Sequence, residues 1–235
     1  DIADEGSLGP KARLLKLKPY QEDIKRIEHS KEPETDLFLD INKICNNFNL
    51  NTSLISRLMS AFTQDIHKKR YQNMNEVIDY CHMAACPAGE MILTLFRQQN
   101  SKNKMYSNHL CIALAMIGML QDIHEDFLKK RIYIPKEDFK KFGLKENDIK
   151  QKKFSPNWQA FKFEWLSRIE DHITQGSDLQ LQLKGRLKIQ IKVLIRTSNL
   201  LVKRLRNSPN NLFIDAPKLS KFDWGYEFLK ALFSQ

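Results

Sequence analysis

Gln121-Asp122-Ile123-His124-Glu125-Asp126 is the segment from which the fold and chemistry of this chain can be inferred. It follows an apolar run of helix length, residues 110–120, and it places Asp122 and Asp126 four residues apart. On a helix this spacing stacks both carboxylates on one face. A cation would relieve their repulsion, and oxygen-only ligands favour magnesium over zinc. The alternative is a solvated helix face, which the spacing alone favours because such a pair costs only about 0.2–0.5 kcal/mol.

The whole chain has the composition of a protein that buries a substantial core. Of its 235 residues, 42% are hydrophobic and 28% are charged, which predicts one large domain over residues 1–235. The longest apolar run, residues 110–120, is too short to span a bilayer, and no charged-then-apolar leader opens the chain. Because the chain opens at Asp1 without a Met, we expect this domain to lack its N-terminal helices.

The cysteines and the net charge restrict the location and the partners. The four cysteines show no Cys-x-x-Cys spacing, so they indicate small core residues in a reducing compartment, and we expect the cytoplasm. The net charge of +10 allows attraction to phosphates, to an anionic membrane or to nucleic acid. Lysines are spread along the chain without a compact basic and aromatic motif, so we expect no nucleic-acid partner.

Apolar periodicity predicts a succession of helices. They are expected at Lys11 to about His29, Asp36 to Asn47, from a cap at Asn51 or Thr52 onward, Met74 to Phe96 and Asn157 to Thr174. In the fourth of these, Pro87 should produce a kink. The small residues Ala84, Ala85, Ala88 and Gly89 leave room beside the backbone. That room serves either close helix packing, which composition favours, or a long apolar ligand.

Residues 179–193 support two local structures. Leu179 to Leu183 and Leu187 to Val193 alternate strictly on either side of Gly185, which is typical of a β-hairpin. The apolar pattern, however, extends to Leu205, longer than an ordinary strand, and Lys188, Lys192 and Arg196 share a helical face. The residues alone leave both structures open.

The sequence lacks a P-loop, a dinucleotide glycine fingerprint and a Gly-x-Ser-x-Gly elbow. Four blocks, together with the tail Pro217 to Trp224, resemble instead the squalene and phytoene synthases, which are head-to-head trans-prenyl synthases. These blocks are Asp1 to Gly6, Asp65 to Tyr71, Tyr80 to Gly89 and Gln121 to Pro135. The resemblance implies the all-α class I terpenoid-synthase fold, a single helical domain around a central cavity. It also resolves residues 179–193 towards helix.

Within that family, Pro87, Gln121 and the tail from Pro217 to Trp224 look most like the hydroxysqualene synthase branch of bacterial hopanoid biosynthesis. The resemblance implies that presqualene diphosphate is ionised and that water captures the carbocation. Other members of the family couple two prenyl diphosphates, such as farnesyl diphosphate, into presqualene diphosphate, squalene or phytoene.

The resemblance also implies roles for individual residues. The expected magnesium ligands are Asp1, Asp4, Asp122 and Asp126, and the expected catalytic residues are Asp4, Asp122, Asp126 and Tyr80. Ala84, Ala85, Ala88 and Gly89 would make room for the isoprenoid chain. Arg70 and Arg131 would contact the diphosphate, with a structural salt bridge as the alternative for each.

Two positions depart from the family pattern. Ala115 and Gly118 stand where the family usually carries Gln and Asn, which weakens the expected contacts with metal and diphosphate. A non-catalytic family member that acts in assembly or interaction is therefore an alternative to an enzyme.

A peripheral contact with the inner membrane is a further hypothesis. It would use the basic residues Lys188, Lys192, Arg196, Lys203, Arg204 and Arg206. The alternative is a solvated basic face, which is favoured because surface lysines are common.

Overall fold

The computed structural model describes residues 2–3 and 8–233, and over this part of the chain it contains helices and no strand. The all-α expectation is confirmed. The helices are α1 (Pro10–Glu28), α2 (Asp36–Phe48), α3 (Ser53–His67), α4 (Met74–Ala84), α5 (Cys86–Leu95), α6 (Ser101–Gln121), α7 (Ile123–Leu128), α8 (Lys136–Phe142), α9 (Glu146–Lys150), α10 (Pro156–Gly176), α11 (Leu179–Gln182), α12 (Gly185–Asn207) and α13 (Lys221–Phe233).

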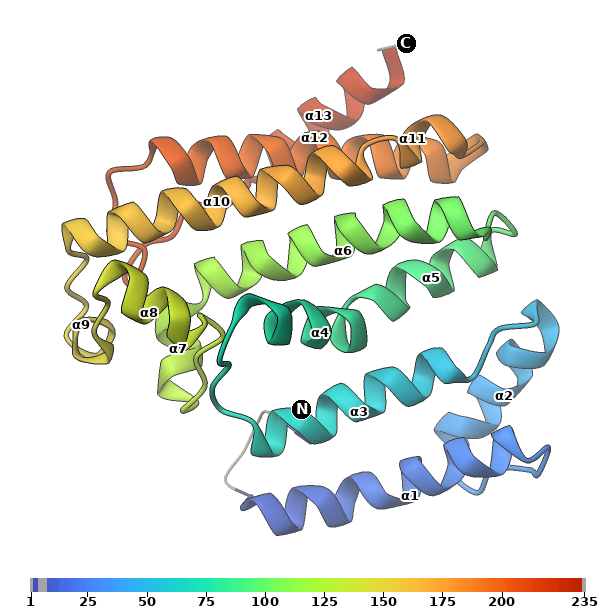
Figure 1. Cartoon of the computed structure of the whole chain (residues 1–235). Coiled ribbons are helices and arrows are strands. Elements are labelled where there is room, and N and C mark those ends of the chain that lie inside the picture. The colour runs from blue at the N-terminus through green and yellow to red at the C-terminus, as the bar shows by residue number, and fades with distance from the viewer. Residues whose placement is uncertain (1, 4–7, 234–235) are drawn as a thin grey trace.

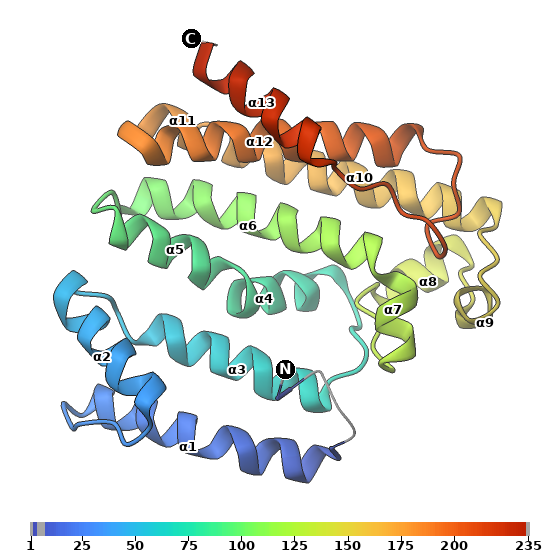
Figure 2. The ribbon, with the colours of Figure 1, turned by 180° about the vertical axis from the view of Figure 1, so that it is seen from behind.

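The long helices are stacked in layers, with α6 in the middle (Figure 1). Helices α1, α2 and α3 lie on one side of α4, α5 and α6, while α10 and α12 lie on the other. The short helices α7, α8 and α9 gather at one end of this stack. The view from behind shows the same order, with α13 outside α12 (Figure 2). Helix α6 thus has neighbours on both sides. Among the described residues, no helix has both the length and the apolar character that crossing a membrane requires.

Packing between α6 and α10 forms the centre of the hydrophobic core. Apolar residues recur every three or four positions along α10, at Trp158, Phe161, Trp165, Leu166, Ile169 and Ile173. Trp165 donates a hydrogen bond from Nε1 to the carbonyl oxygen of Met116 over 2.9 Å, which satisfies its only polar group. Gly176 permits the close approach of the two helices, since a Cβ there would lie 2.9 Å from the Tyr106 carbonyl oxygen.

Residues 179–193 form α11 and the start of α12, separated by a turn at residues 183–184, so the choice of helix over hairpin is confirmed. Helix α12 begins at Gly185, which adopts a φ of +59° that other residues rarely tolerate. The turn before it is held by Gln98, whose side chain accepts from the Lys184 amide over 2.7 Å. The local alternation of apolar and polar residues is misleading here. Leu187, Ile191 and Leu194 are spaced by four and three residues, as on one face of a helix, and all three line the same cavity.

Two helix breaks differ from expectation. The predicted kink at Pro87 is a full break two residues earlier, at Ala85, where φ is −118° and ψ is −47°. Proline lacks an amide proton and suits the first turn of a helix, so the chain restarts as α5 with Pro87 in that turn. Asp122 and Asp126 do not share one continuous helix, because α6 ends at Gln121 and α7 begins at Ile123.

Candidate functional site

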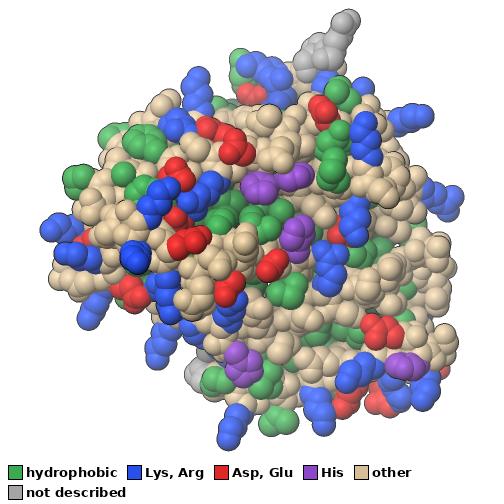
Figure 3. Space-filling view, in the orientation of Figure 1, with side chains coloured by type: hydrophobic (Ala, Val, Ile, Leu, Met, Phe, Trp, Pro, Cys, Tyr) green, Lys and Arg blue, Asp and Glu red, His purple; other side chains and the backbone are tan. Residues whose placement is uncertain are grey.

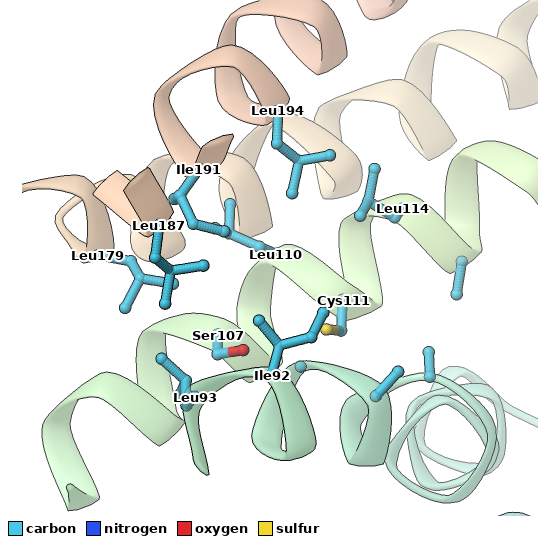
Figure 4. Close-up of a pocket in the computed structure, with 14 residues that line it drawn as sticks. Ile92, Leu93, Ser107, Leu110, Cys111, Leu114, Leu179, Leu187, Ile191 and Leu194 are labelled. Carbon is cyan, nitrogen blue, oxygen red and sulfur yellow. The ribbon is translucent and has the colours of Figure 1, made fainter. Parts of the chain in front are cut away.

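An apolar cavity of about 390 Å³ lies between α5 and α6 on one side and α11 and α12 on the other (Figure 4). The polar groups of its wall are the Ser107 hydroxyl and the Cys111 thiol. The lining residues are Ala85, Ala88, Gly89, Ile92, Leu93, Ser107, Leu110, Cys111, Leu114, Ala115, Leu179, Leu187, Ile191 and Leu194. A wall of aliphatic side chains with few polar groups suits a long apolar ligand.

Three of the four small residues predicted to make room for an isoprenoid line this cavity. Ala85, Ala88 and Gly89 form part of its α5 wall, whereas Ala84 packs against the hydrophobic core. Their methyl groups and hydrogen leave free volume that larger side chains would occupy. These three residues therefore border an apolar cavity, and their contact with an isoprenoid chain stays a prediction.

Gly89 also serves close helix packing. A Cβ at this position would lie 2.7 Å from Cys111 Sγ and even closer to Ser107 Oγ. These distances are shorter than van der Waals contact, so a larger residue would displace the Ser107 hydroxyl and the Cys111 thiol from their positions between α5 and α6. Both interpretations of the small residues apply: Gly89 allows the approach of two helices, and its neighbours widen the space beside them.

One face of α6 leads from the cavity to the predicted acidic site. Cys111, Ala115, Gly118 and Asp122 follow one another at steps of four, three and four residues, which keeps them on one side of the helix. Cys111 and Ala115 line the cavity, and a Cβ at Gly118 would meet no atom of the described residues within 4 Å. Along α6 this face is therefore apolar at Cys111 and Ala115, without a side chain at Gly118 and acidic at Asp122. At the rise of an α-helix these residues span about 16 Å.

Asp122 occupies the junction between α6 and α7. Its φ of −101° and ψ of 15° depart from helix, but its amide still donates to the Gly118 carbonyl over 2.9 Å. The Asp126 amide donates to the Asp122 carbonyl over 2.8 Å, so both acids remain on adjacent turns. Just before the junction, Gln121 Nε2 donates to the Pro217 carbonyl oxygen over 2.6 Å. This bond joins the end of α6 to the segment that precedes α13.

The surroundings of Asp122 disfavour its negative charge. Its side chain reaches solvent, yet partial desolvation, followed by the charge of Glu125, raises the pKa of Asp122 above its ordinary value. A cation would remove this penalty, and carboxylate oxygens are donors that magnesium accepts. The donor chemistry at Asp122 and Asp126 therefore fits a hard divalent cation.

The other expected metal ligands, Asp1 and Asp4, lie outside the described residues. Within residues 2–3 and 8–233, no group of three or more His, Cys, Asp or Glu side chains is arranged to hold a metal ion. Magnesium binding stays a prediction.

Tyr80 lies in a buried polar cluster between α3, α4 and the segment after α7. Its hydroxyl donates to Asp65 Oδ2 over 3.0 Å and lies 3.1 Å from the Tyr133 hydroxyl. Arg131 Nη1 donates to the Tyr133 hydroxyl over 2.7 Å and lies 3.5 Å from Asp65 Oδ1. The Tyr71 ring stacks on Tyr133 with centroids 5.5 Å apart. These five residues form what we call the Asp65 cluster.

Burial determines the protonation of the tyrosines in the Asp65 cluster. Desolvation, followed by the nearby Tyr133 and Asp65, raises the pKa of Tyr80. Desolvation also raises the pKa of Tyr71 and of Tyr133. All three hydroxyls are therefore neutral donors at physiological pH.

The two arginines predicted to contact diphosphate both have protein partners. Arg131 is 5% exposed and pairs with Asp65, which is the salt-bridge role that the sequence left open. Arg70 pairs with Glu146, and its guanidinium carbon lies 4.6 Å from the centre of the Phe139 ring. Diphosphate contact by either arginine stays a prediction.

The family model for squalene/phytoene synthase matches residues 1–223 of the chain. The chain belongs to the squalene/phytoene synthase family. This membership confirms the resemblance seen in the sequence blocks and places the chain among enzymes.

Relatives of this family member include two kinds of synthase. It is 29% identical over 217 residues to a hydroxysqualene synthase of Sinorhizobium fredii, covering 88% of this chain and 70% of that protein. It is 26% identical over 145 residues to a phytoene synthase of Mycobacterium tuberculosis, covering 62% of this chain and 47% of that protein. The chain thus spans less than half the length of the phytoene synthase.

Solved structures confirm the class I fold expected for the family. A squalene synthase from Alicyclobacillus acidocaldarius superposes with a TM-score of 0.79 at 25% identity, covering 88% of this chain and 77% of the other. A dehydrosqualene synthase in complex with a ligand gives 0.82 at 18% identity, covering 92% and 76%.

Sequence reasoning assigned no role to several residues that the structure brings to the site. Asp65 and Tyr133 fall inside the sequence blocks that carry the family resemblance, and this position is the feature that could have identified them as site residues. Leu187, Ile191 and Leu194 form the opposite cavity wall, and nothing in the sequence indicates which helix faces α5 and α6.

Proposed function

We propose that this family member is a magnesium-dependent prenyl-diphosphate enzyme of squalene and hopanoid biosynthesis. It would convert presqualene diphosphate to hydroxysqualene by ionising the diphosphate and capturing the cation with water. The observation that carries this proposal is the single face of α6, which lines an apolar cavity up to Ala115 and presents Asp122 two turns later. A substrate with a charged head and a long hydrocarbon tail matches that order.

The residues of the chain would share the work as follows. Asp122 and Asp126 would hold magnesium, which when bound supplies positive charge to the departing diphosphate. Ala85, Ala88 and Gly89 would accept the hydrocarbon and keep bulk water from it. The relatives named as hydroxysqualene synthases support water capture as the final step over coupling of two substrates.

Tyr80 would act as a neutral hydrogen-bond donor. Its buried hydroxyl is already bonded to Asp65, and its raised pKa prevents it from acting as a general base near neutral pH. A Tyr80→Phe variant separates this role from packing, because the ring remains while the donor is lost.

Product analysis tests the reaction. The purified protein would be incubated with presqualene diphosphate, and separately with farnesyl diphosphate, with magnesium or with EDTA, and the lipids identified by mass spectrometry. We expect hydroxysqualene from presqualene diphosphate with magnesium only. Products from farnesyl diphosphate alone would support a coupling synthase. If the protein turned over neither of these substrates, and did not turn over geranylgeranyl diphosphate either, the proposal that it is an enzyme would be contradicted.

Paired variants test the acidic site. Asp122→Asn keeps the size of the side chain and removes its charge, so we expect kcat to fall by about 100-fold or more. Asp40→Asn makes the same change at an exposed position on α2 and should leave kcat unchanged. Equal activity of both variants would exclude Asp122 from the reaction.

A non-catalytic role is the second candidate, and Ala115 and Gly118 favour it. Ala115 contributes a methyl group to the apolar wall, and none of the described residues comes within 4 Å of the place where a Cβ of residue 118 would be. Neither position offers a polar side chain to metal or phosphate. If the protein acts in assembly, cells carrying Asp122→Ala with Asp126→Ala would retain its function. Loss of function with normal protein levels would support catalysis.

We also propose a cytoplasmic location with a peripheral contact at the inner membrane. Once the diphosphate has left, the product carries no charged group and would partition into lipid. Cell fractionation tests this location: recovery with membranes that is reversed by salt is expected, and recovery only in the supernatant would contradict it.

A further inference from the structure

Helix α13 is attached to the rest of the molecule by its acidic side. Glu227 Oε2 accepts a hydrogen bond from Arg196 Nε over 2.7 Å, and Asp223 Oδ2 accepts one from Arg204 Nη1 over 2.7 Å. Glu227 is 7% exposed, and Ala231, one turn further along, is buried as well. The side of α13 that faces α12 therefore consists of two carboxylates and a small residue.

The opposite side of α13 is apolar and faces solvent. Phe222, Tyr226 and Leu229 follow one another at helical spacing and are 90%, 58% and 55% exposed. We call these three residues the α13 stripe. Figures 1 and 2 show α13 at the outer edge of the molecule, with its C-terminal end pointing away from the other helices. The usual arrangement, with apolar residues towards the protein, is reversed here.

The ion pairs between α12 and α13 explain why the apolar side of α13 faces solvent. Arg196 and Arg204 of α12 bond to α13, and Arg206 donates to Glu170 Oε2 over 2.6 Å. At least three of the six basic residues first considered for membrane contact are thus engaged in ion pairs. In this structure the arginines of α12 orient α13, and α13 presents the surface.

The residues around the α13 stripe match an anionic lipid surface. Lys221 and Lys230 are exposed at the two ends of the helix, and Lys230 Nζ lies 4.2 Å from the centre of the Tyr226 ring. Aromatic side chains flanked by lysines are characteristic of helices that lie in the membrane interface. A second copy of the chain is disfavoured as the occupant, because each copy carries a net charge of +10.

We propose that α13 lies on anionic membranes, with the α13 stripe inserted among the lipids and Lys221 and Lys230 at the headgroups. The helix would lie in the plane of the interface, because its 13 residues are too few to cross a bilayer and the carboxylates on the side that faces α12 must stay out of the lipid. This inference deepens the peripheral contact proposed above. It depends on the surface of the protein and not on turnover, so it can fail while the enzymatic proposal holds.

Vesicle sedimentation tests the proposal without substrate. The protein would be mixed with vesicles of phosphatidylcholine alone or with 30% phosphatidylglycerol. We expect binding to the anionic vesicles only, weakened by salt. The variant Phe222→Gln, Tyr226→Gln, Leu229→Gln should lose at least about tenfold in vesicle affinity, because Gln keeps helix propensity but removes the apolar contact.

A matched variant controls for the loss of exposed apolar surface in general. Leu15, Leu128 and Leu181 are each 68% exposed on three different helices, so changing all three to Gln should leave vesicle binding unchanged. Circular dichroism and thermal unfolding would verify that both triple variants are folded. Equal binding of the α13 variant and the wild type would overturn the proposal.

Tryptophan fluorescence gives a second, site-specific measurement. Trp158 and Trp165 are fully buried, whereas Trp224 on α13 is 46% exposed. Because Trp224 lies off the α13 stripe, a Phe222→Trp, Trp224→Phe variant moves the exposed indole into the stripe. Anionic vesicles should shift the emission of this variant to shorter wavelength and protect it from acrylamide. Unchanged quenching would overturn the proposal, as would self-association without lipid that the α13 variant abolishes, since that result would identify a second copy as the occupant.

Discussion

The Tyr80 hydroxyl donates a hydrogen bond to Asp65 Oδ2 over 3.0 Å in the interior of the protein, where both side chains are less than a tenth exposed. A buried carboxylate needs donors, and Asp65 is also 3.5 Å from the Arg131 guanidinium. The bond therefore joins a residue predicted to be catalytic to an ion pair that stabilises the fold.

Tyr80→Phe should destabilise the protein by about 1–2 kcal/mol, since it removes one donor from a buried acceptor. Urea unfolding measures the change. Tyr226→Phe removes a hydroxyl from an exposed ring and should change the free energy of unfolding by less than about 0.5 kcal/mol. If the two variants were equally stable, the bond to Asp65 would contribute nothing.

Two helical glycines should respond in opposite directions to alanine. Gly176→Ala places a Cβ 2.9 Å from the Tyr106 carbonyl oxygen, a backbone atom that cannot rotate away, so we expect a loss of about 1–3 kcal/mol. Gly118→Ala meets none of the described residues within 4 Å and should gain about 0.5–1 kcal/mol from helix propensity. Thermal unfolding of the two variants measures both effects, and a stabilising Gly176→Ala would show that α6 and α10 can separate at no cost.

The histidine pair between α6 and α10 should make stability depend on pH. His109 Nδ1 and His172 Nδ1 are 3.0 Å apart, and burial, followed by the charge of His109, lowers the pKa of His172 to about 4. Because the folded pKa is below the ordinary value near 6.5, the unfolded chain binds the proton more tightly. Stability should therefore fall as the pH decreases from about 6.5 to about 4.

Variants of His172 test this pH dependence. His172→Gln should flatten the dependence of the urea midpoint on pH in that window by an amount on the order of 1–2 kcal/mol. His67→Gln, at an exposed position on α3, should leave the slope unchanged. An identical slope for His172→Gln and the wild type would exclude the pair as its source. His82 and Asp171 also influence His172, with opposite effects on its pKa.

Breaking the ion pair of α13 should loosen that helix alone. Glu227→Ala leaves Arg196 without its 2.7 Å partner, so we expect amides 221–233 to exchange hydrogen about tenfold faster or more. Glu22→Ala removes one member of a pair in which both side chains are more than half exposed, and it should have no measurable effect. Faster exchange throughout the protein would indicate global destabilisation instead.

Much of the fold follows from local patterns in the sequence. The helices around Leu17, Phe38, Ile66, Val77 and Trp165 are where apolar periodicity predicts them, because each buries one face. Helix boundaries were less predictable: Pro87 signals a break, but its position at Ala85 depends on how α5 packs. The choice of helix at Gly185 came from the family resemblance, since the local alternation also fits strands.

The candidate site was predictable only in part. Ala85, Ala88 and Gly89 were identified because small residues beside a proline leave space, and they line the cavity. The α12 wall was not, because Ile191 and Leu194 reach the cavity through tertiary packing that no local pattern specifies. Arg131 was ambiguous in the sequence, and its partner Asp65 is 66 residues away.

The bond from Gln121 to Pro217 connects residues that are 96 positions apart. Closing a loop of this length has an entropic cost that local helices avoid, so this contact should form late in folding. During synthesis, residue 217 leaves the ribosome well after α6, so the junction next to Asp122 cannot be completed until α12 and the segment after it have also been translated. Assembly of the acidic end therefore waits for a part of the chain that is made about 96 residues later.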